Sequence, residues 1–277
     1  MDHAAERLVA CVCRLTPMSD PWAQIRAIPP VTRGWAGACL GATVGMSLRV
    51  LDPYFLTLNW PRVWSLFEVW RPVTCFCFLG GFSLNFVFQM MFLIRYGSQL
   101  EGGTFQGRPD DYAYMLAFCA TTLLALGYVT QGTALEGNFV VLGPTLIFAV
   151  LYVWARHNEH ARVSIYGLIT VTGLQLPWAF LGMTVLMGGN PVPDLIGILV
   201  GHLYFFLKAI HPVRTGTRLL DTPAWFTNLT ARAGLGAPVY VDPRAPARPA
   251  YGSGTAGAPP RTAFPGRPRT VGRAHAD

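Results

Sequence analysis

The sequence predicts an all-α membrane protein with six transmembrane helices. Hydrophobic residues make up 52% of its 277 residues and charged residues only 13%, about half the charged fraction of soluble domains. The charged residues are clustered, so long stretches of the chain contain none. A helix needs about 20 apolar residues to cross the hydrocarbon core of a bilayer. Six stretches have that length, at approximately 31–51, 72–94, 112–131, 137–155, 164–187 and 192–210.

Basic residues near the helix ends predict the orientation of the chain, because cytosolic loops carry an excess of Lys and Arg. With six spans, ten basic residues lie on the side of both termini, and three lie opposite, Arg49, Arg62 and Arg71. We therefore expect both termini in the cytosol. The net charge of +7 comes largely from the segment after residue 210. Such a distribution is typical of topology signals or contacts with anionic lipid, and it does not indicate a nucleic-acid partner.

The first helix and the connection after it have unusual compositions. The helix contains glycines spaced three or four residues apart, Gly34, Gly37, Gly41 and Gly45, so we expect it to pack closely on its neighbours. The connection over 52–72 is apolar and aromatic, whereas an aqueous loop would be polar. We expect it to lie within the membrane interface, where tryptophans gather. Its tryptophans are Trp60, Trp64 and Trp70.

Two polar residues interrupt the second helix. Asn85 and Gln89 are four residues apart and therefore share one face of a helix. In hydrocarbon their side chains must meet another helix, water or a substrate. Two interpretations remain open at this point: hydrogen bonds between helices, or a wet, substrate-facing gate.

The sixth helix combines two glycines with a histidine. Gly197 and Gly201 lie on one helix face, where the missing side chains let another backbone approach. His202 follows directly, and a histidine at membrane depth is costly unless it faces protein or water. We expect His202 to be a satisfied histidine within the helix bundle.

The ends of the chain and the cysteines carry weaker signals. Residues 1–17 have the character of an N-terminal extension before a second candidate start at Met18, and residues 227–277 are rich in Pro, Gly, Ala and Arg, which predicts a disordered tail. The glycine-rich segment 100–112 has no βαβ context and is interpreted as a loop. The six cysteines and the histidines complete no zinc-ligand set, so we expect no metal and no cofactor.

Several strings along the chain resemble a known family. Trp70-Arg71 together with Gly197-x-x-x-Gly201-His202 resembles the rhomboid superfamily. Longer strings resemble the derlins within it, namely Gly107-Arg-Pro-Asp-Asp-Tyr112, Leu151-Tyr-Val-Trp-Ala155, Leu176-Pro-Trp178 and Gly201-His-Leu-Tyr-Phe-Phe-Leu207.

The resemblance extends from about Met18 to about Phe226. It implies a rhomboid-like bundle of six transmembrane helices over residues 18–226, with a membrane-associated first loop and a disordered C-terminal tail.

A comparison with rhomboid proteases bears on catalysis. These enzymes share a catalytic Ser–His dyad. Its serine lies in a Gly-x-Ser-Gly motif at the start of the fourth helix, and its histidine lies in the sixth helix. Here the fourth helix opens with Gly143-Pro-Thr145-Leu and contains no serine, and Ser83 lies in the second helix without a following glycine. A nucleophile must lie within hydrogen-bonding reach of its base. We expect a pseudoprotease, and an intramembrane protease using Thr145 or Ser83 is the alternative.

The derlin resemblance implies a non-catalytic component of endoplasmic-reticulum-associated degradation. Such a protein lies in the endoplasmic reticulum membrane, binds misfolded proteins and assists their retrotranslocation to the cytosol. The implied partners are misfolded substrates, a membrane-bound ubiquitin ligase complex, further copies or other derlins, and the lipid bilayer. A small-solute transporter is a second alternative, although no strong internal repeat supports it.

The resemblance also implies roles for individual residues. Trp70 and Arg71 would anchor the first loop at the luminal interface, Gly197 and Gly201 would allow close helix packing, and His202 would be a core histidine without a catalytic role. In the tail, a degenerate box for a cytosolic AAA unfoldase retains Phe264, Gly266 and Val271. Pro268 replaces its second glycine and restricts the backbone. The alternative for this segment is an unstructured spacer.

Overall fold

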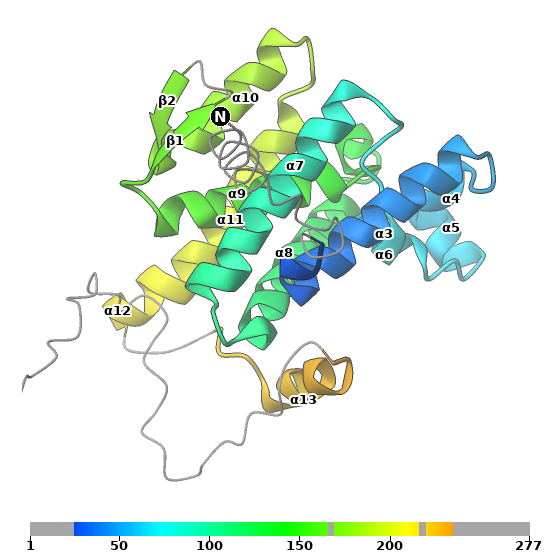
Figure 1. The fold of residues 1–277 in the computed structure, drawn as a ribbon. Coiled ribbons are helices and arrows are strands. Elements are labelled where there is room, and N and C mark those ends of the chain that lie inside the picture. Colours follow the sequence, from blue (N-terminus) through cyan, green and yellow to red (C-terminus); the bar gives the residue numbers. More distant parts are fainter. Residues whose placement is uncertain (1–24, 166–168, 216–219, 235–277) are drawn as a thin grey trace, which may run out of the picture. The chain divides into compact units, whose positions relative to one another are not determined.

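The computed structural model describes residues 25–165, 169–215 and 220–234, all within one unit of the chain (Figure 1). The expected N-terminal extension lies outside these residues. So do the tail beyond residue 234 and the candidate unfoldase box with Phe264, Gly266 and Val271.

A bundle of helices forms the body of the described chain (Figure 1). Its main members are α3 (Pro30–Ser47), α7 (Leu84–Gln99), α8 (Pro109–Val129), α9 (Gly143–His157), α10 (Leu176–Leu186) and α11 (Val192–Phe205). Every one of these helices except α7 has proline in its first turn, where the missing N–H leaves no intrahelical bond broken. Ser83 caps α7, since its hydroxyl oxygen accepts from the backbone N–H of Phe86 at 3.2 Å.

Shorter elements connect and extend the bundle. The first connection contains α4 (Pro53–Leu56), α5 (Trp60–Ser65) and α6 (Arg71–Thr74), and later turns contain η1 (Leu100–Thr104), η2 (Glu136–Phe139) and η3 (Gly173–Gln175). The sixth helix continues through η4 (Phe206–Ile210) into α12 (His211–Thr215), and α13 (Ala224–Arg232) follows.

Two of the described helical segments are long and apolar enough to cross a membrane. They are Pro109–Val129 and the continuous segment Val192–Arg214. The fold is therefore mostly helical, as predicted, whereas four of the six expected spans are shorter or less apolar than this criterion requires.

The second predicted helix begins later than expected. The sequence predicted a helix over 72–94, but α6 ends at Thr74 and α7 begins only at Leu84. Gly80 between them has a φ of 97°, a left-handed conformation that glycine adopts without steric cost. The break shortens the apolar part of this helix, and α7 continues past the expected end to Gln99.

The fifth predicted helix is wrong in its first half. Residues within 164–187 were expected to be helical from the start, but β1 (Arg162–Ile165) and β2 (Ile169–Thr172) form an antiparallel hairpin. Its register pairs Val163 with Val171 and Ser164 with Thr170. All four residues of β2 and two of the four in β1 are β-branched, and such residues favour extended backbone. The helix α10 begins only at Leu176.

The segment predicted as a plain loop over 100–112 contains a buried carboxylate that caps another helix. Glu101 is only 5% exposed. Its oxygens accept from the backbone N–H groups of Val31 (2.9 Å) and Thr32 (2.8 Å), and from the Thr32 hydroxyl (2.8 Å). The first N–H groups of a helix have no intrahelical partner, and a negative charge is favourable there. Glu101 therefore fixes the start of α3 against the end of α7.

Replacing this carboxylate should loosen the contact between α3 and α7. We expect Glu101→Ala to lower the free energy of unfolding by about 1–3 kcal/mol, because it leaves buried N–H donors without acceptors. Glu101→Gln keeps one acceptor oxygen and should cost less. Thermal unfolding in nanodiscs measures both. The control is Glu159→Ala, which removes a partly exposed ion pair with Arg156 and should change stability by less than about 1 kcal/mol.

The first residues of the expected disordered tail are helical instead. The tail was expected from residue 227, but α13 continues to Arg232 and packs on the start of α8. The rings of Tyr114 and Phe226 meet edge-on with centroids 5.5 Å apart. The Thr222 hydroxyl donates to the carboxylate of Asp111 in the first turn of α8. These contacts attach α13 to the bundle.

Candidate functional site

The helices α9 and α11 meet backbone to backbone at two glycines. A Cβ added to Gly197 would lie 2.7 Å from the Cβ of Phe148 and closer still to the carbonyl oxygen of Thr145. A Cβ added to Gly201 would lie 2.8 Å from the carbonyl oxygen of Ala149. Only glycine fits this contact without displacing backbone. The glycine motif of the sixth helix thus lies where α9 and α11 approach each other closely.

The glycines of the first helix do not make the close contacts that were expected. A Cβ added to Gly34, Gly37 or Gly41 would have no atom within 4 Å. At Gly45 the three nearest atoms would all belong to the side chain of Leu51, just beyond the end of the same helix. The expectation was wrong because glycine spacing alone does not reveal which helix face has a neighbour.

His202 is exposed on the surface of α11, so its expected place in the core is also wrong. Its Nδ1 lies 2.8 Å from the hydroxyl oxygen of Tyr152 on α9, and the two rings meet edge-on. The histidine thus spans the α9–α11 contact from outside.

The two candidate nucleophiles, Thr145 and Ser83, do not have the surroundings of a catalytic hydroxyl group. Thr145 is 1% exposed, and its hydroxyl has no hydrogen-bond partner within the described chain. The Ser83 hydroxyl caps α7. The Nδ1 atom of His202 is already hydrogen-bonded to the Tyr152 hydroxyl. Among residues 25–165, 169–215 and 220–234, no hydrogen bond joins either hydroxyl to His202.

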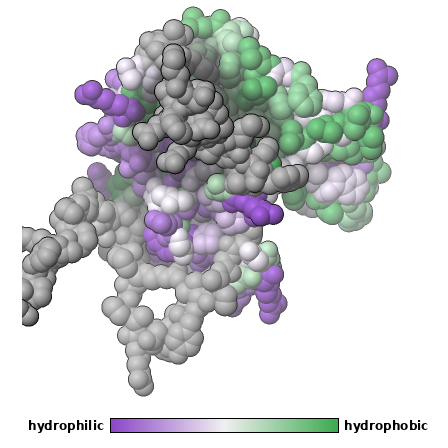
Figure 2. Space-filling view, in the orientation of Figure 1, coloured by the Kyte–Doolittle hydropathy of each residue, from purple (hydrophilic) through white to green (hydrophobic). Residues whose placement is uncertain are grey.

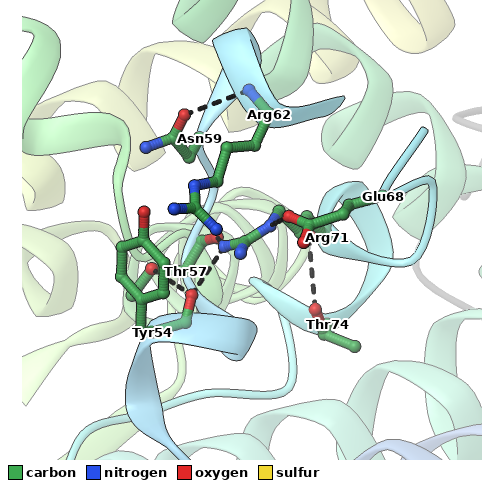
Figure 3. A network of polar contacts seen from close by, with 7 residues as sticks. All are labelled: Tyr54, Thr57, Asn59, Arg62, Glu68, Arg71 and Thr74. Carbon is green, nitrogen blue, oxygen red and sulfur yellow. Dashed lines mark hydrogen bonds and ion pairs between the residues drawn. The ribbon is translucent and has the colours of Figure 1, made fainter. Parts of the chain in front are cut away.

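Arg71 is the centre of a polar cluster that folds the first loop (Figure 3). Its side chain is fully buried, and its Nε pairs with the carboxylate of Glu68. Its Nη1 donates to the carbonyl oxygens of Tyr54 (2.6 Å) and Thr57 (2.9 Å). The guanidinium carbon also lies 5.0 Å from the centroid of the Tyr54 ring. Arg71 therefore ties α4 to the start of α6.

Trp70 lies beside this cluster with its side chain half exposed. Many large apolar side chains of the same loop are exposed, among them Phe55, Trp64, Leu66, Phe67 and Val69. Figure 2 shows hydrophobic surface on the side of the molecule where α4 and α5 lie. A group of exposed apolar side chains of this kind marks contact with a membrane or another protein.

A cavity of about 600 Å³ opens at the end of the bundle where α7, α9 and α11 begin and α10 ends. Much of its wall is apolar, formed by Phe88, Phe92, Ile147, Phe148, Phe180 and Met183. Asn85 and Gln89 both line it, and the Gln89 Oε1 is buried without a hydrogen-bond partner in the described chain. This arrangement favours the wet, substrate-facing interpretation of the two residues over hydrogen bonding between helices.

Asp194 also lines the cavity, although it was not among the site residues predicted from the sequence. The residue is 5% exposed in the first turn of α11. Its carboxyl interacts with the Thr184 hydroxyl, while its Oδ2 has no hydrogen-bond partner within the described part of the chain. In the sequence it marks the end of a charge-free stretch, next to a glycine- and proline-rich turn. Its position just after Pro191 and Pro193, inside a helix start, was the available signal.

Two loops approach each other at the cavity wall. The Asn190 side-chain amide donates to the Asn138 side-chain oxygen at 2.7 Å, and both residues line the cavity. Over the described ranges, no group of three or more His, Cys, Asp or Glu residues is placed to hold a metal ion. The cavity wall itself offers amide groups, one carboxyl group and apolar side chains.

Known proteins resemble this chain over most of its length. The Der1-like family model matches residues 28–224. Derlin-1 of Oryza sativa subsp. japonica is 40% identical over 241 residues, which cover 87% of this chain and 96% of that protein. Derlin-1 of Arabidopsis thaliana is 39% identical over 240 residues, with coverages of 87% and 86%. Derlin-2.2 of Zea mays is 37% identical over 239 residues, with coverages of 79% and 96%. The resemblance to the derlins is thereby confirmed, and the chain belongs to the Der1-like family of membrane proteins.

Proposed function

We propose that this protein is a non-catalytic component of endoplasmic-reticulum-associated degradation. It binds misfolded proteins and assists their retrotranslocation to the cytosol, from a rhomboid-like bundle of six transmembrane helices with both termini cytosolic. The single observation that carries the proposal is the cavity at one end of the bundle. Its wall combines aromatic side chains with the polar groups of Asn85, Gln89 and Asp194.

Such a cavity suits an unfolded segment at membrane depth. Moving an unsatisfied backbone polar group into hydrocarbon costs several kcal/mol. The amide side chains of Asn85 and Gln89 offer donors and acceptors to that backbone, while the aromatic wall accommodates apolar side chains. Binding here lowers the cost of bringing a misfolded chain into the membrane, and this step needs no nucleophile.

The short α10 contributes to the same mechanism. Its 11 residues extend over about 16 Å, roughly half the thickness of the hydrocarbon core. A bilayer thins around a helix that is too short to cross it. The membrane beside the cavity is therefore thinner, which shortens the apolar path of the substrate.

The surroundings of Thr145 support a role without catalysis. Activation of a threonine hydroxyl requires a base within hydrogen-bonding reach. The Nδ1 of His202 pairs with Tyr152 instead, and the buried Thr145 hydroxyl has no hydrogen-bond partner among the described residues.

The partners belong to the proposal as well. They are a membrane-bound ubiquitin ligase complex, further copies or other derlins, and a cytosolic AAA unfoldase that binds the tail box. Exposed His202 supports a protein neighbour, since a histidine that faces lipid is costly.

A degradation assay in cells that lack their own derlins tests the function. The half-life of a misfolded luminal reporter is followed after the protein is restored as wild type, Thr145→Ala or Gly201→Val. We expect wild type and Thr145→Ala to restore fast turnover and Gly201→Val to fail, because only the glycine contact is essential. Loss of rescue by Thr145→Ala, at unchanged protein level, would support the protease alternative. Failure of the wild type would contradict the proposed function.

A glycosylation test checks the orientation. Asn228-Leu-Thr230 is an acceptor sequence for N-linked glycans, and Asn228 is exposed on α13. We expect no glycan there when the protein is made in endoplasmic reticulum microsomes, because a cytosolic C-terminal segment never meets the luminal transferase. A mobility shift that glycosidase removes would reverse the orientation. An acceptor sequence inserted after Gly132, on the opposite side, serves as the positive control.

A further inference from the structure

Asp194 gives the cavity a charge that nothing in its wall balances. The wall contains no Lys, Arg or His residue among those described. The carboxyl lies in the first turn of α11, where the helix dipole favours a negative charge. Its Oδ2 nevertheless has no hydrogen-bond partner within the described chain. The cavity thus holds a buried carboxylate with an unused acceptor.

A second acceptor lies in the same wall. The Oε1 of Gln89 on α7 is buried and has no donor in the described residues. Buried acceptors without donors are costly, and a buried charge without a partner is more so. A ligand that fits this cavity therefore has to supply hydrogen-bond donors, and a positive charge satisfies the carboxylate best.

We propose that Asp194 makes this cavity a site for a basic side chain, Lys or Arg, carried by the substrate segment. The apolar stem of such a side chain lies along Phe92, Phe180 and Met183, and its charged end reaches the carboxylate. A basic residue at the centre of a membrane span is costly. Pairing with Asp194 removes part of that cost. The cavity thereby selects membrane segments that carry a misplaced positive charge. This inference rests on the proposed function and specifies the substrate class of the same site.

The test compares synthetic apolar peptides that differ at one central position. The protein is placed in nanodiscs with a photo-crosslinking residue at Met187, an exposed position of the cavity wall. The probes are 21-residue peptides of about one membrane thickness, with Lys, Gln or Glu at the centre. We expect the Lys peptide to bind roughly tenfold more tightly than the Gln peptide, as one charge-assisted hydrogen bond allows. The Glu peptide should bind most weakly.

Three variants show whether Asp194 is responsible. Asp194→Asn should remove the preference for Lys over Gln, and Asp194→Glu should keep it. Glu136→Gln is the matched control, because it removes one exposed carboxylate from the element beside the cavity without changing the wall. The preference should survive in that variant. Persistence of the preference in Asp194→Asn would overturn the assignment.

The wild-type protein alone also decides the question. Equal crosslinking of the Lys and Gln peptides would overturn the basic-residue preference and leave the cavity as a substrate site. Crosslinking of none of the peptides would overturn both the preference and the proposed function of the cavity. The result therefore does not depend on how well any variant folds.

Discussion

Gly197→Val should destabilise the protein more than any other single change in the sixth helix. The added Cβ alone would enter the space occupied by the Thr145 carbonyl oxygen and the Phe148 Cβ, and valine adds two methyl groups to it. Overpacking typically costs about 1–3 kcal/mol, but here the two nearest atoms are a backbone oxygen and a Cβ, and neither can rotate away. We therefore expect a loss of at least about 3 kcal/mol and separation of α9 from α11.

Thermal unfolding with a thiol-reactive dye measures this effect, because Cys39, Cys75 and Cys119 are buried in the folded chain. For a protein of this size about 1 kcal/mol shifts the midpoint by 2–4 °C, so Gly197→Val should lower it by at least about 6 °C. The control is Gly37→Val in α3, where the added Cβ meets no atom within 4 Å. Equal shifts in the two variants would contradict the role of the α9–α11 contact.

The comparison of these two helices shows how far the sequence predicts the packing. Gly37 and Gly41 in α3 have the same spacing as Gly197 and Gly201 in α11, and the same close contact was expected of both. Only the α11 pair makes it. Spacing establishes that glycines share a face, whereas the neighbour of that face depends on the arrangement of the whole bundle.

Apolar composition was similarly incomplete as a guide to secondary structure. The starts of the second and fifth helices were predicted too early. In the second, the apolar run continues through a break at Gly80, and in the fifth it continues through the strands β1 and β2. An apolar run records burial or lipid contact and says less about whether the backbone is helical. Arg71 was singled out from the sequence as an anchor of the first loop, but its partners Glu68 and Tyr54 became visible only in the fold.

The cavity shows a different limit of prediction from the sequence. Asn85 and Gln89 were singled out because polar residues in an apolar helix are conspicuous. Asp194 was overlooked because an acidic residue beside a turn is ordinary in a sequence. Its significance arises from burial and from the missing partner of its Oδ2, both of which are properties of the folded chain.

The second large effect is expected at Arg71. Arg71→Met removes the guanidinium that pairs with Glu68 and leaves the carbonyl oxygens of Tyr54 and Thr57 without their donor. Loss of one partner from a buried ion pair typically costs about 3–5 kcal/mol, because the remaining charge stays buried. We expect a loss of stability in that range, and faster proteolysis of the first loop than in the wild type.

Further substitutions separate the charge pair from the rest of the cluster. Adding Glu68→Gln to Arg71→Met should recover part of the stability, since no buried charge is then left unpaired. Arg71→Lys should recover little, because one ammonium group cannot replace the Nε and Nη1 bonds together. The control is Arg62→Met: that guanidinium lies 4.6 Å from the same Tyr54 ring but is only partly buried, so its loss should cost about 1 kcal/mol or less. If Arg62→Met and Arg71→Met proved equally destabilising, contact with the Tyr54 ring, not the buried pair with Glu68, would hold the first loop in place.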